Sequence, residues 1–284
     1  MNLTERVIKY ALFLMALSAV SGLALITFFI FKEGLPIMGK VGLREFIASS
    51  HWLPTKGHFG IFPMIVGSLV VTLLAMAIGV PFGLACAIFL SEFCPRRVAF
   101  FMKPIIELLA GIPSVVYGFM GVIYLVPLIR DHLGGPGMSV LACGIILAVM
   151  ILPTQISISV DALRAVPRSY REASLAMGAT VWQTTHRVVL KAARSGILAA
   201  VILAMGRAIG ETMAVIMVAG NSPRVPHSIL DPVRTLTTNI ALEMGYASGD
   251  HRLALFATGV VLFVIIMVLN SLTSVIMRRR EGQG

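Results

Sequence analysis

The feature of this chain that most limits its fold is a series of six long apolar runs separated by polar loops. The runs cover residues 10–31, about 64–90, about 104–129, 138–160, 197–219 and 253–277. A helix needs about 20 apolar residues to cross the hydrocarbon core of a bilayer, and each run is long enough. Backbone groups in lipid must find their hydrogen bonds inside the segment, so such runs form helices. The sequence therefore predicts an all-α integral membrane protein with six transmembrane helices.

The composition supports a single transmembrane domain over residues 1–284. The chain is 57% apolar and 13% charged, whereas about a quarter of the residues in a soluble domain are charged. The first apolar run is longer than the core of about 7–15 residues of a secretory signal, and no small-residue cleavage site follows it. We therefore expect this run to be retained as the first membrane helix.

Lysine and arginine gather in the loops on one side of the predicted bundle. The two termini and the loops after the second and fourth runs carry 14 of them, against 8 in the remaining loops. Basic loops stay in the cytoplasm, so both termini are expected there. The net charge of +10 then reflects topology. A nucleic-acid partner is not expected, because the chain lacks a basic domain outside the membrane.

Two charged residues, Arg207 and Glu211, interrupt the fifth apolar run. A charge near the bilayer centre costs about 2.5–3.5 kcal/mol, and such residues usually face a bundle interior or a hydrated path. At a spacing of four they share one face of a continuous helix and can pair. A guanidinium matches the oxygens of an anion, and a competing carboxylate would keep binding weak enough for release. We predict that both line an anion path; a purely structural ion pair is the alternative.

The loop over residues about 161–196 carries a second signal. Pro167 is a plausible helix start and Gly178 a plausible helix stop. Between them lies a short apolar surface edged by charges, formed by Tyr170, Ala173, Leu175, Ala176 and Met177. A helix this short, with so many small residues, binds lipid weakly, so docking in a groove of a partner is the better interpretation.

The spacing of this loop resembles the EAA loop of ABC importer permeases. The spacing fits at Glu172, Ala173, Gly178 and Leu190, with Ser174, Val188 and Lys191 standing where the family has alanine, isoleucine and proline. The resemblance implies the type I ABC importer permease fold. It also implies that Glu172, Ala173 and Gly178 belong to a coupling helix that seats in a cleft of an ATPase subunit.

Residues 107–118 and 206–215 resemble the phosphate-specific ABC importer permeases, the PstC and PstA family, and residues 31–63 look closer to PstC. The resemblance implies an inner-membrane permease subunit, in a prokaryote, that moves inorganic phosphate into the cell. The implied partners are a PstA-like second permease, a PstB-like ATPase dimer and a PstS-like external phosphate-binding protein, all working in a lipid bilayer.

The chain itself has none of the marks of an enzyme. It contains no Gly-x-x-x-x-Gly-Lys-Ser/Thr phosphate loop, so ATP and magnesium are expected on the partner ATPase and no cofactor on this chain. The three cysteines are scattered, and the six histidines lie in loops without clustering. We therefore expect neither a disulfide framework nor a metal site.

Details of the helices and loops can also be predicted. Three runs contain proline and should bend, at Pro81, Pro113 and Pro153. In the run that contains Pro113, we expect the helix to be broken within residues 107–113 rather than only bent. The pairs Gly79/Gly83 and Gly206/Gly210 have the spacing that permits close helix approach. External loops 32–63 and 220–252 are long enough to contact a soluble partner; as plain connectors they would place Trp52 at the membrane interface.

Three alternatives remain open from the sequence. One is a permease for another oxyanion, such as sulfate or molybdate. Another is a secondary transporter or channel that needs no ATPase, although the chain lacks the internal repeat that many secondary transporters show. The third is a membrane scaffold that senses phosphate through its partners, a role compatible with transport.

Overall fold

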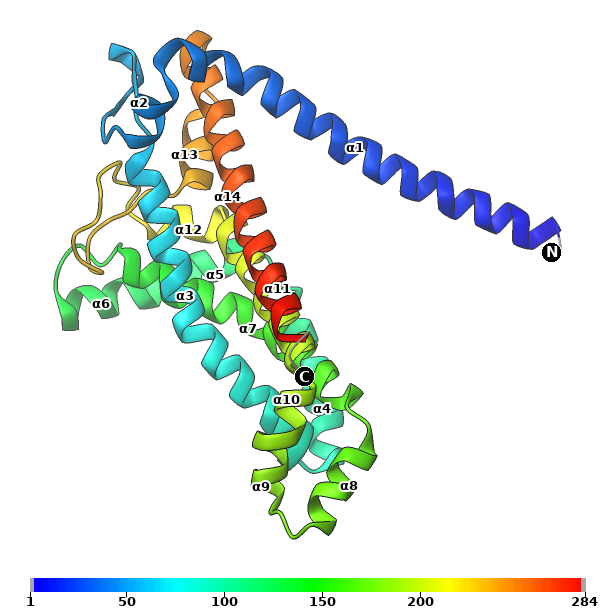
Figure 1. The fold of residues 1–284 in the computed structure, drawn as a ribbon. Helices are drawn as coiled ribbons and strands as arrows, with labels where there is room; N and C mark the ends of the chain where they lie inside the picture. The colour runs from blue at the N-terminus through cyan, green and yellow to red at the C-terminus, as the bar shows by residue number, and fades with distance from the viewer. Residues whose placement is uncertain (1–2, 282–284) are drawn as a thin grey trace.

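The computed structural model describes residues 3–281 as a bundle of tilted helices that one helix leaves (Figure 1). Helix α1 (Leu3–Val41) meets α14 (Gly249–Glu281) near one end of the bundle and then runs away from it. Residues 5–26 of α1 are exposed throughout. An apolar helix of this length with no protein around it is a surface for lipid or for another membrane subunit.

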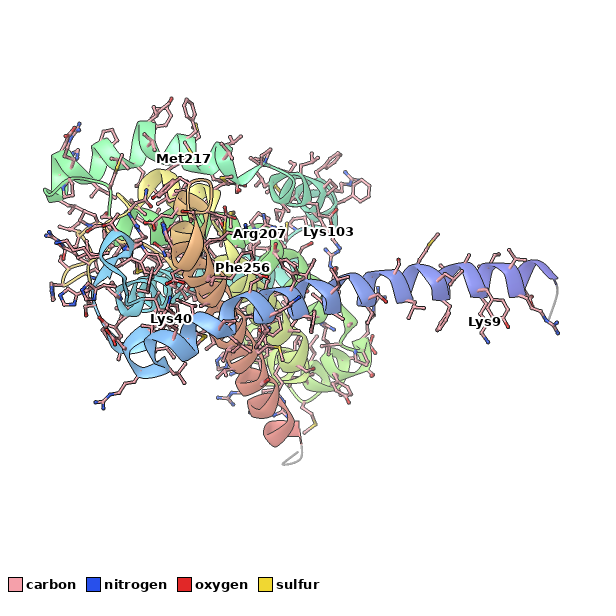
Figure 2. The ribbon with its side chains drawn as sticks, turned by 90° about the horizontal axis from the view of Figure 1, so that it is seen from above. Lys9, Lys40, Lys103, Arg207, Met217 and Phe256 are labelled. Atoms are coloured by element: carbon pink, nitrogen blue, oxygen red, sulfur yellow. The ribbon has the colours of Figure 1, made fainter. Side chains whose placement is uncertain are left out.

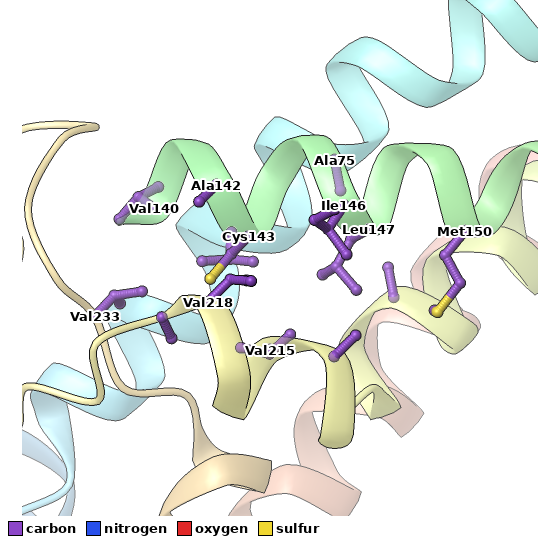
Figure 3. Close-up of a cluster of buried hydrophobic side chains, with 14 of the residues drawn as sticks. Ala75, Val140, Ala142, Cys143, Ile146, Leu147, Met150, Val215, Val218 and Val233 are labelled. Carbon is purple, nitrogen blue, oxygen red and sulfur yellow. The ribbon is translucent and has the colours of Figure 1, made fainter. Parts of the chain in front are cut away.

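The core of the bundle is formed by α3 (Phe62–Ile88), α7 (Val140–Ala165) and α11 (Arg194–Gly210). Helices α3 and α7 touch closely because two glycines face α7: a Cβ on Gly79 would lie 2.7 Å from Ile151 Cδ1, and one on Gly83 would lie 2.6 Å from Gln155 Cγ. The close approach predicted for this glycine pair is confirmed. Figure 3 shows the apolar side chains that α7 and its neighbours bury beside this contact.

The third apolar run does not form the helix expected over residues 104–129. It is divided between α4 (Arg96–Ala110) and a crossing built from α5 (Ser114–Met120), the π-helical turn η3 (Gly121–Leu125) and α6 (Val126–Leu133). Pro113 causes the division, because proline clashes with a preceding helical turn and restricts the residue before it. The predicted break within 107–113 is confirmed, and the crossing begins at Ser114.

The fifth run is also divided. Helix α11 ends at Gly210, and α12 (Met213–Val218) follows after Glu211 and Thr212. Ahead of α11 lie α9 (Val181–Thr184), the π-helical turn η4 (Thr185–Val189) and α10 (Leu190–Ala192), and the axis bends by 70° between residues 181–192 and 194–210. Within the described residues, five helices can span a membrane, or six when this bent pair counts as one span, which agrees with the expected fold.

The two long loops, which the sequence predicts to be external, contain secondary structure. The first contains α2 (Leu43–Ala48), strands β1 (Trp52–Leu53) and β2 (His58–Phe59), and the turn η1 (Pro54–Lys56) between the strands. The second contains α13 (Leu236–Glu243).

A buried carboxylate joins these two loops. Trp52 is buried and its Nε1 donates to Glu243 Oε2 at 2.9 Å, while Arg234 Nη1 and His251 Nε2 contact the same carboxylate at 2.7 and 2.8 Å. The interpretation of Trp52 as an anchor at the membrane interface is therefore wrong. Its indole N–H is satisfied inside the protein, where it ties the first of these long loops to the second.

Candidate functional site

The first candidate site lies where the fifth crossing is broken. Arg207 occupies the last turn of α11 and is half-buried. Viewed from above, it lies within the group of helices and away from the free part of α1 (Figure 2). Its Nε atom is buried without a hydrogen-bond partner. The ion pairs formed among the described residues do not include Arg207, so its charge is not neutralised by a carboxylate.

Glu211 is placed differently from the expectation. Its backbone is extended, with φ −70° and ψ 131°, and it ends α11. Its Oε1 accepts the Ala214 N–H of α12 at 3.1 Å, and its carbonyl accepts the Thr237 hydroxyl at 3.0 Å. The predicted pairing with Arg207 is therefore wrong: the helix stops at Gly210, so the two side chains no longer stand one turn apart on a common face.

The break is held in place by α5. Gly118 allows α12 to approach, because a Cβ there would lie 2.8 Å from Met217 Sδ and 3.0 Å from Ala214 Cα. The neighbouring Tyr117 donates to the Leu109 carbonyl at 2.8 Å, and its hydroxyl lies within electrostatic range of Arg207. The structure thus brings together the two segments whose sequences resemble phosphate permeases, 107–118 and 206–215. Sequence reasoning gave Tyr117 no role of its own, although it lies in the first segment.

One flank of Arg207 is open in this chain. Among the described residues, nothing lies within 4 Å of a Cβ placed on Gly206 or on Gly210. The close approach expected at this second glycine pair is not made by any helix in the described part of the chain. The glycine-bearing face of α11 beside Arg207 is therefore free for another molecule.

Chemically, this site offers a guanidinium whose buried Nε has no partner in the protein. A buried donor without a partner costs about 1–3 kcal/mol, and a planar guanidinium can place two parallel N–H groups on one oxyanion. The carboxylate of Glu211, four residues further along the chain, accepts the Ala214 N–H of α12 instead of pairing with Arg207. The arrangement favours reversible binding of an anion at the break, with Arg207 as the attracting group.

The second candidate site is α8 (Arg168–Ala176), at the end of the molecule opposite α2 (Figure 1). The helix starts directly after Pro167, and Gly178 has φ +83°, a left-handed conformation that glycine adopts at little cost. Both predicted boundaries are confirmed. Glu172, Ala173 and Gly178 are exposed. So are the apolar side chains of Tyr170, Leu175 and Met177, which leaves the predicted docking surface uncovered.

Sequence reasoning missed the residue that fixes α8. Arg171 Nη2 and Nε donate to the two carboxylate oxygens of Glu92 at 2.7 and 3.1 Å. Its Nη1 and Nη2 also donate to the carbonyls of Val166 and Leu163 at 2.8 and 2.9 Å. The hydrogen-bonded carboxylate of Glu92 raises the pKa of Arg171 above its ordinary value. The two residues are 79 positions apart, and no motif in a single sequence connects them.

Comparison with known proteins places these features in a family. Residues 79–282 match the family described as binding-protein-dependent transport system inner membrane component. The chain is 43% identical to the probable ABC transporter permease protein YqgH of Bacillus subtilis, over 94% of this chain and 88% of that protein. It is 36% identical to the phosphate transport system permease protein PstC of Mesorhizobium japonicum, over 84% of this chain and 80% of the relative.

Solved structures agree on the fold. A permease chain of the inward-facing MetNI methionine ABC transporter superimposes with a TM-score of 0.62 at 20% identity, covering 77% of this chain and 95% of its own length. A chain of a bacterial ABC transporter for the import of alginate gives 0.63 at 16% identity, covering 98% of this chain and 99% of its own. The chain therefore belongs to the family of binding-protein-dependent transport system inner membrane components, as a non-enzymatic ABC permease subunit with the type I importer fold.

Proposed function

We propose that this chain is the permease subunit of an ABC importer for inorganic phosphate, and that Arg207 and Glu211 line the path of the ion. The observation that carries the proposal is the buried, unpartnered Nε of Arg207 at the break between α11 and α12. Relatives named phosphate transport system permease protein PstC, from Mesorhizobium japonicum and Methanocaldococcus jannaschii, support phosphate as the anion.

The break gives Arg207 and Glu211 separate roles. Phosphate carries between one and two negative charges near neutral pH, and its oxygens suit the fork of the guanidinium. The Glu211 carboxylate stays bound to the Ala214 N–H, so it leaves Arg207 free while its negative charge limits how tightly a nearby anion is held. Interrupted helices near the membrane midplane are a common way to build a transport site whose access alternates between the two sides.

The exposed surfaces of the chain support its proposed partners. The bare length of α1 and the open glycine face of α11 are suited to a second permease, which we take to be PstA-like. The uncovered α8, with Glu172, Ala173 and Gly178, is suited to the cleft of a PstB-like ATPase, which would bind ATP and magnesium. A PstS-like protein would deliver phosphate at the end that carries α2.

The orientation and extent of the chain follow from the same assignment. Docking of α8 on a cytoplasmic ATPase places the basic loops and both termini in the cytoplasm, in agreement with the distribution of lysine and arginine. Residues 1–284 then act as one transmembrane domain, with the coupling loop at about 161–196 as its cytoplasmic extension.

Uptake by the reconstituted complex tests the proposal. Proteoliposomes holding this chain with its ATPase, second permease and binding protein should import radiolabelled phosphate only when ATP is supplied. Arg207→Gln should reduce uptake to background while the purified complex keeps its subunit stoichiometry. Arg97→Gln, which removes an exposed arginine in the first turn of α4, is the matched control and should leave uptake unchanged.

Three results would refute it. Normal uptake by Arg207→Gln would remove Arg207 from the path. Uptake by this chain alone, without nucleotide, would make it a secondary transporter or channel. Sulfate or molybdate that stimulates ATP hydrolysis in place of phosphate would assign the permease to another oxyanion.

A further inference from the structure

Helix α8 is held in place by polar contacts rather than by a hydrophobic core. All nine of its residues are described, and none of them is buried. A cavity of about 740 Å³ opens between α8 and the ends of α3, α4 and α7, with Arg168, Arg171 and Glu172 on its α8 side. Most short helices in proteins depend on tertiary packing of an apolar face. Since α8 has no such packing, its position relative to the membrane helices depends on a few side chains.

Arg171 makes the contacts that reach the membrane helices. Its two bonds to Glu92 bind α8 to the π-helical turn η2 (Phe89–Phe93), which continues α3. Its bonds to Leu163 and Val166 bind α8 to the last turn of α7. The Glu92 side chain is 8% exposed and that of Arg171 is 22% exposed. A bidentate pair fixes orientation as well as distance, so this one side chain can hold three elements in a fixed arrangement.

The other polar contact of α8 leads elsewhere. The hydroxyls of Ser174 and Thr184 are 2.9 Å apart and join α8 to α9, which continues through η4 and α10 into α11. Helix α8 is therefore linked to α11 along the chain and through Ser174, whereas the polar link to α3 and α7 runs through Arg171. Removing Arg171 or Glu92 would cut the polar link from α8 to α3 and α7 and leave the link from α8 to α11 intact.

We infer that Arg171 and Glu92 are positioning residues: together they make α3 and α7 follow α8 when the cytoplasmic ATPase displaces it. This inference rests on the proposed function, because it requires α8 to be the element that the ATPase moves. Without the joint, the ATPase still engages the exposed face of α8 and still hydrolyses ATP. The core helices α3 and α7, packed together at Gly79 and Gly83, then no longer move with α8, and less solute crosses for each ATP consumed.

The test measures solute imported per ATP hydrolysed by the complete complex in proteoliposomes. Arg171→Gln and Glu92→Gln should lower this ratio by at least about fivefold, the lower end of typical coupling between two sites. Arg164→Gln is the matched control, because Arg164 lines the same cavity from the last turn of α7, is exposed, lies outside α8 and takes no part in the bonds between Arg171 and Glu92. It should leave the ratio unchanged. Arg171→Lys keeps the positive charge but not the forked guanidinium, so it should give an intermediate ratio. If Arg171→Gln does not assemble into the complex, Arg171→Lys takes its place in the test.

A distance measurement tests the joint independently of the solute. Spin labels on cysteines introduced at Phe89 and Ser169, in a chain without its native cysteines, report the separation of η2 and α8 in the assembled complex. The separation should be the same with and without a non-hydrolysable ATP analogue, and should change with nucleotide once Glu92→Gln is added. Equal nucleotide-induced changes with and without that substitution, or a transport ratio for Arg171→Gln and Glu92→Gln that matches that of Arg164→Gln, would overturn the inference. A wild-type complex that imports no phosphate would refute the proposed function and leave this distance test standing.

Discussion

Arg171 and Arg207 belong to the same chain and carry the same side chain, but their surroundings differ. Arg171, on α8, donates four hydrogen bonds to one carboxylate and two carbonyls. Arg207, at the break in the fifth crossing, has a buried Nε that donates to nothing. An unpaired buried donor costs about 1–3 kcal/mol. The Arg171 guanidinium joins elements of the chain, whereas our proposal is that the Arg207 guanidinium is held for a ligand.

The largest effect that this comparison predicts is a loss of transport without a loss of stability. Arg207→Gln should abolish phosphate uptake, while the thermal unfolding midpoint of the purified chain in detergent stays the same or rises. The reason is that the substitution removes a charge that has no partner in the protein. If Arg207→Gln lowered the thermal unfolding midpoint as much as Glu92→Gln, which breaks the pair with Arg171, Arg207 would have a structural role. The contrast between the two arginines would then be lost.

The reverse pattern, a loss of stability, is expected at the joint between Arg171 and Glu92. Glu92→Gln leaves the charge of Arg171 partly buried without its counter-ion, and breaking a buried pair in this way costs about 3–5 kcal/mol. Because Arg171 retains some exposure to water, the loss should lie near the lower end of that range. Denaturant titration of the purified chain measures it. Arg168→Gln on the same helix serves as the control and should change the free energy of unfolding by less than about 0.5 kcal/mol.

The two glycine pairs extend the comparison to helix packing. Gly83→Ala should destabilise the isolated chain by about 1–3 kcal/mol, the usual cost of overpacking, because its Cβ would press on Gln155 Cγ. Gly206→Ala meets nothing in the described residues and should leave that stability unchanged. If the second permease covers this face, Gly206→Ala should instead weaken co-purification of the two permeases. Unchanged assembly would place the interface elsewhere.

The sequence predicted most of the fold because apolar length and proline act locally. The runs of apolar residues located the crossings, Pro113 located a break, and Pro167 and Gly178 located the ends of α8. What it could not predict depends on contacts between distant residues. Nothing in the spacing of Arg207 and Glu211 revealed that the helix stops between them, where Thr237, from a later loop, holds the Glu211 carbonyl. The link between Arg171 and Glu92 and the burial of Trp52 against Glu243 are non-local in the same way.

The smallest effect expected is at Asp231, a carboxylate in the loop between α12 and α13. Asp231 accepts the backbone N–H groups of His227 and Ser228 at 2.8 and 2.9 Å, and these bonds lower the pKa of its carboxyl. A carboxylate whose pKa is lower in the folded state than the unfolded value of about 3.9 stabilises the fold above that value. This contribution is lost as the pH falls through the folded pKa.

As the pH falls from about 5 through the folded pKa, the thermal unfolding midpoint of wild type should therefore fall further than that of Asp231→Asn. Asp131→Asn, whose exposed carboxylate accepts from the Arg130 side chain, controls for the change in net charge. Parallel pH profiles for wild type and Asp231→Asn would show that the loop does not depend on this carboxylate, and that hydrogen bonds to a charged group stabilise this chain measurably only where water is excluded, as at Arg171 and Glu92.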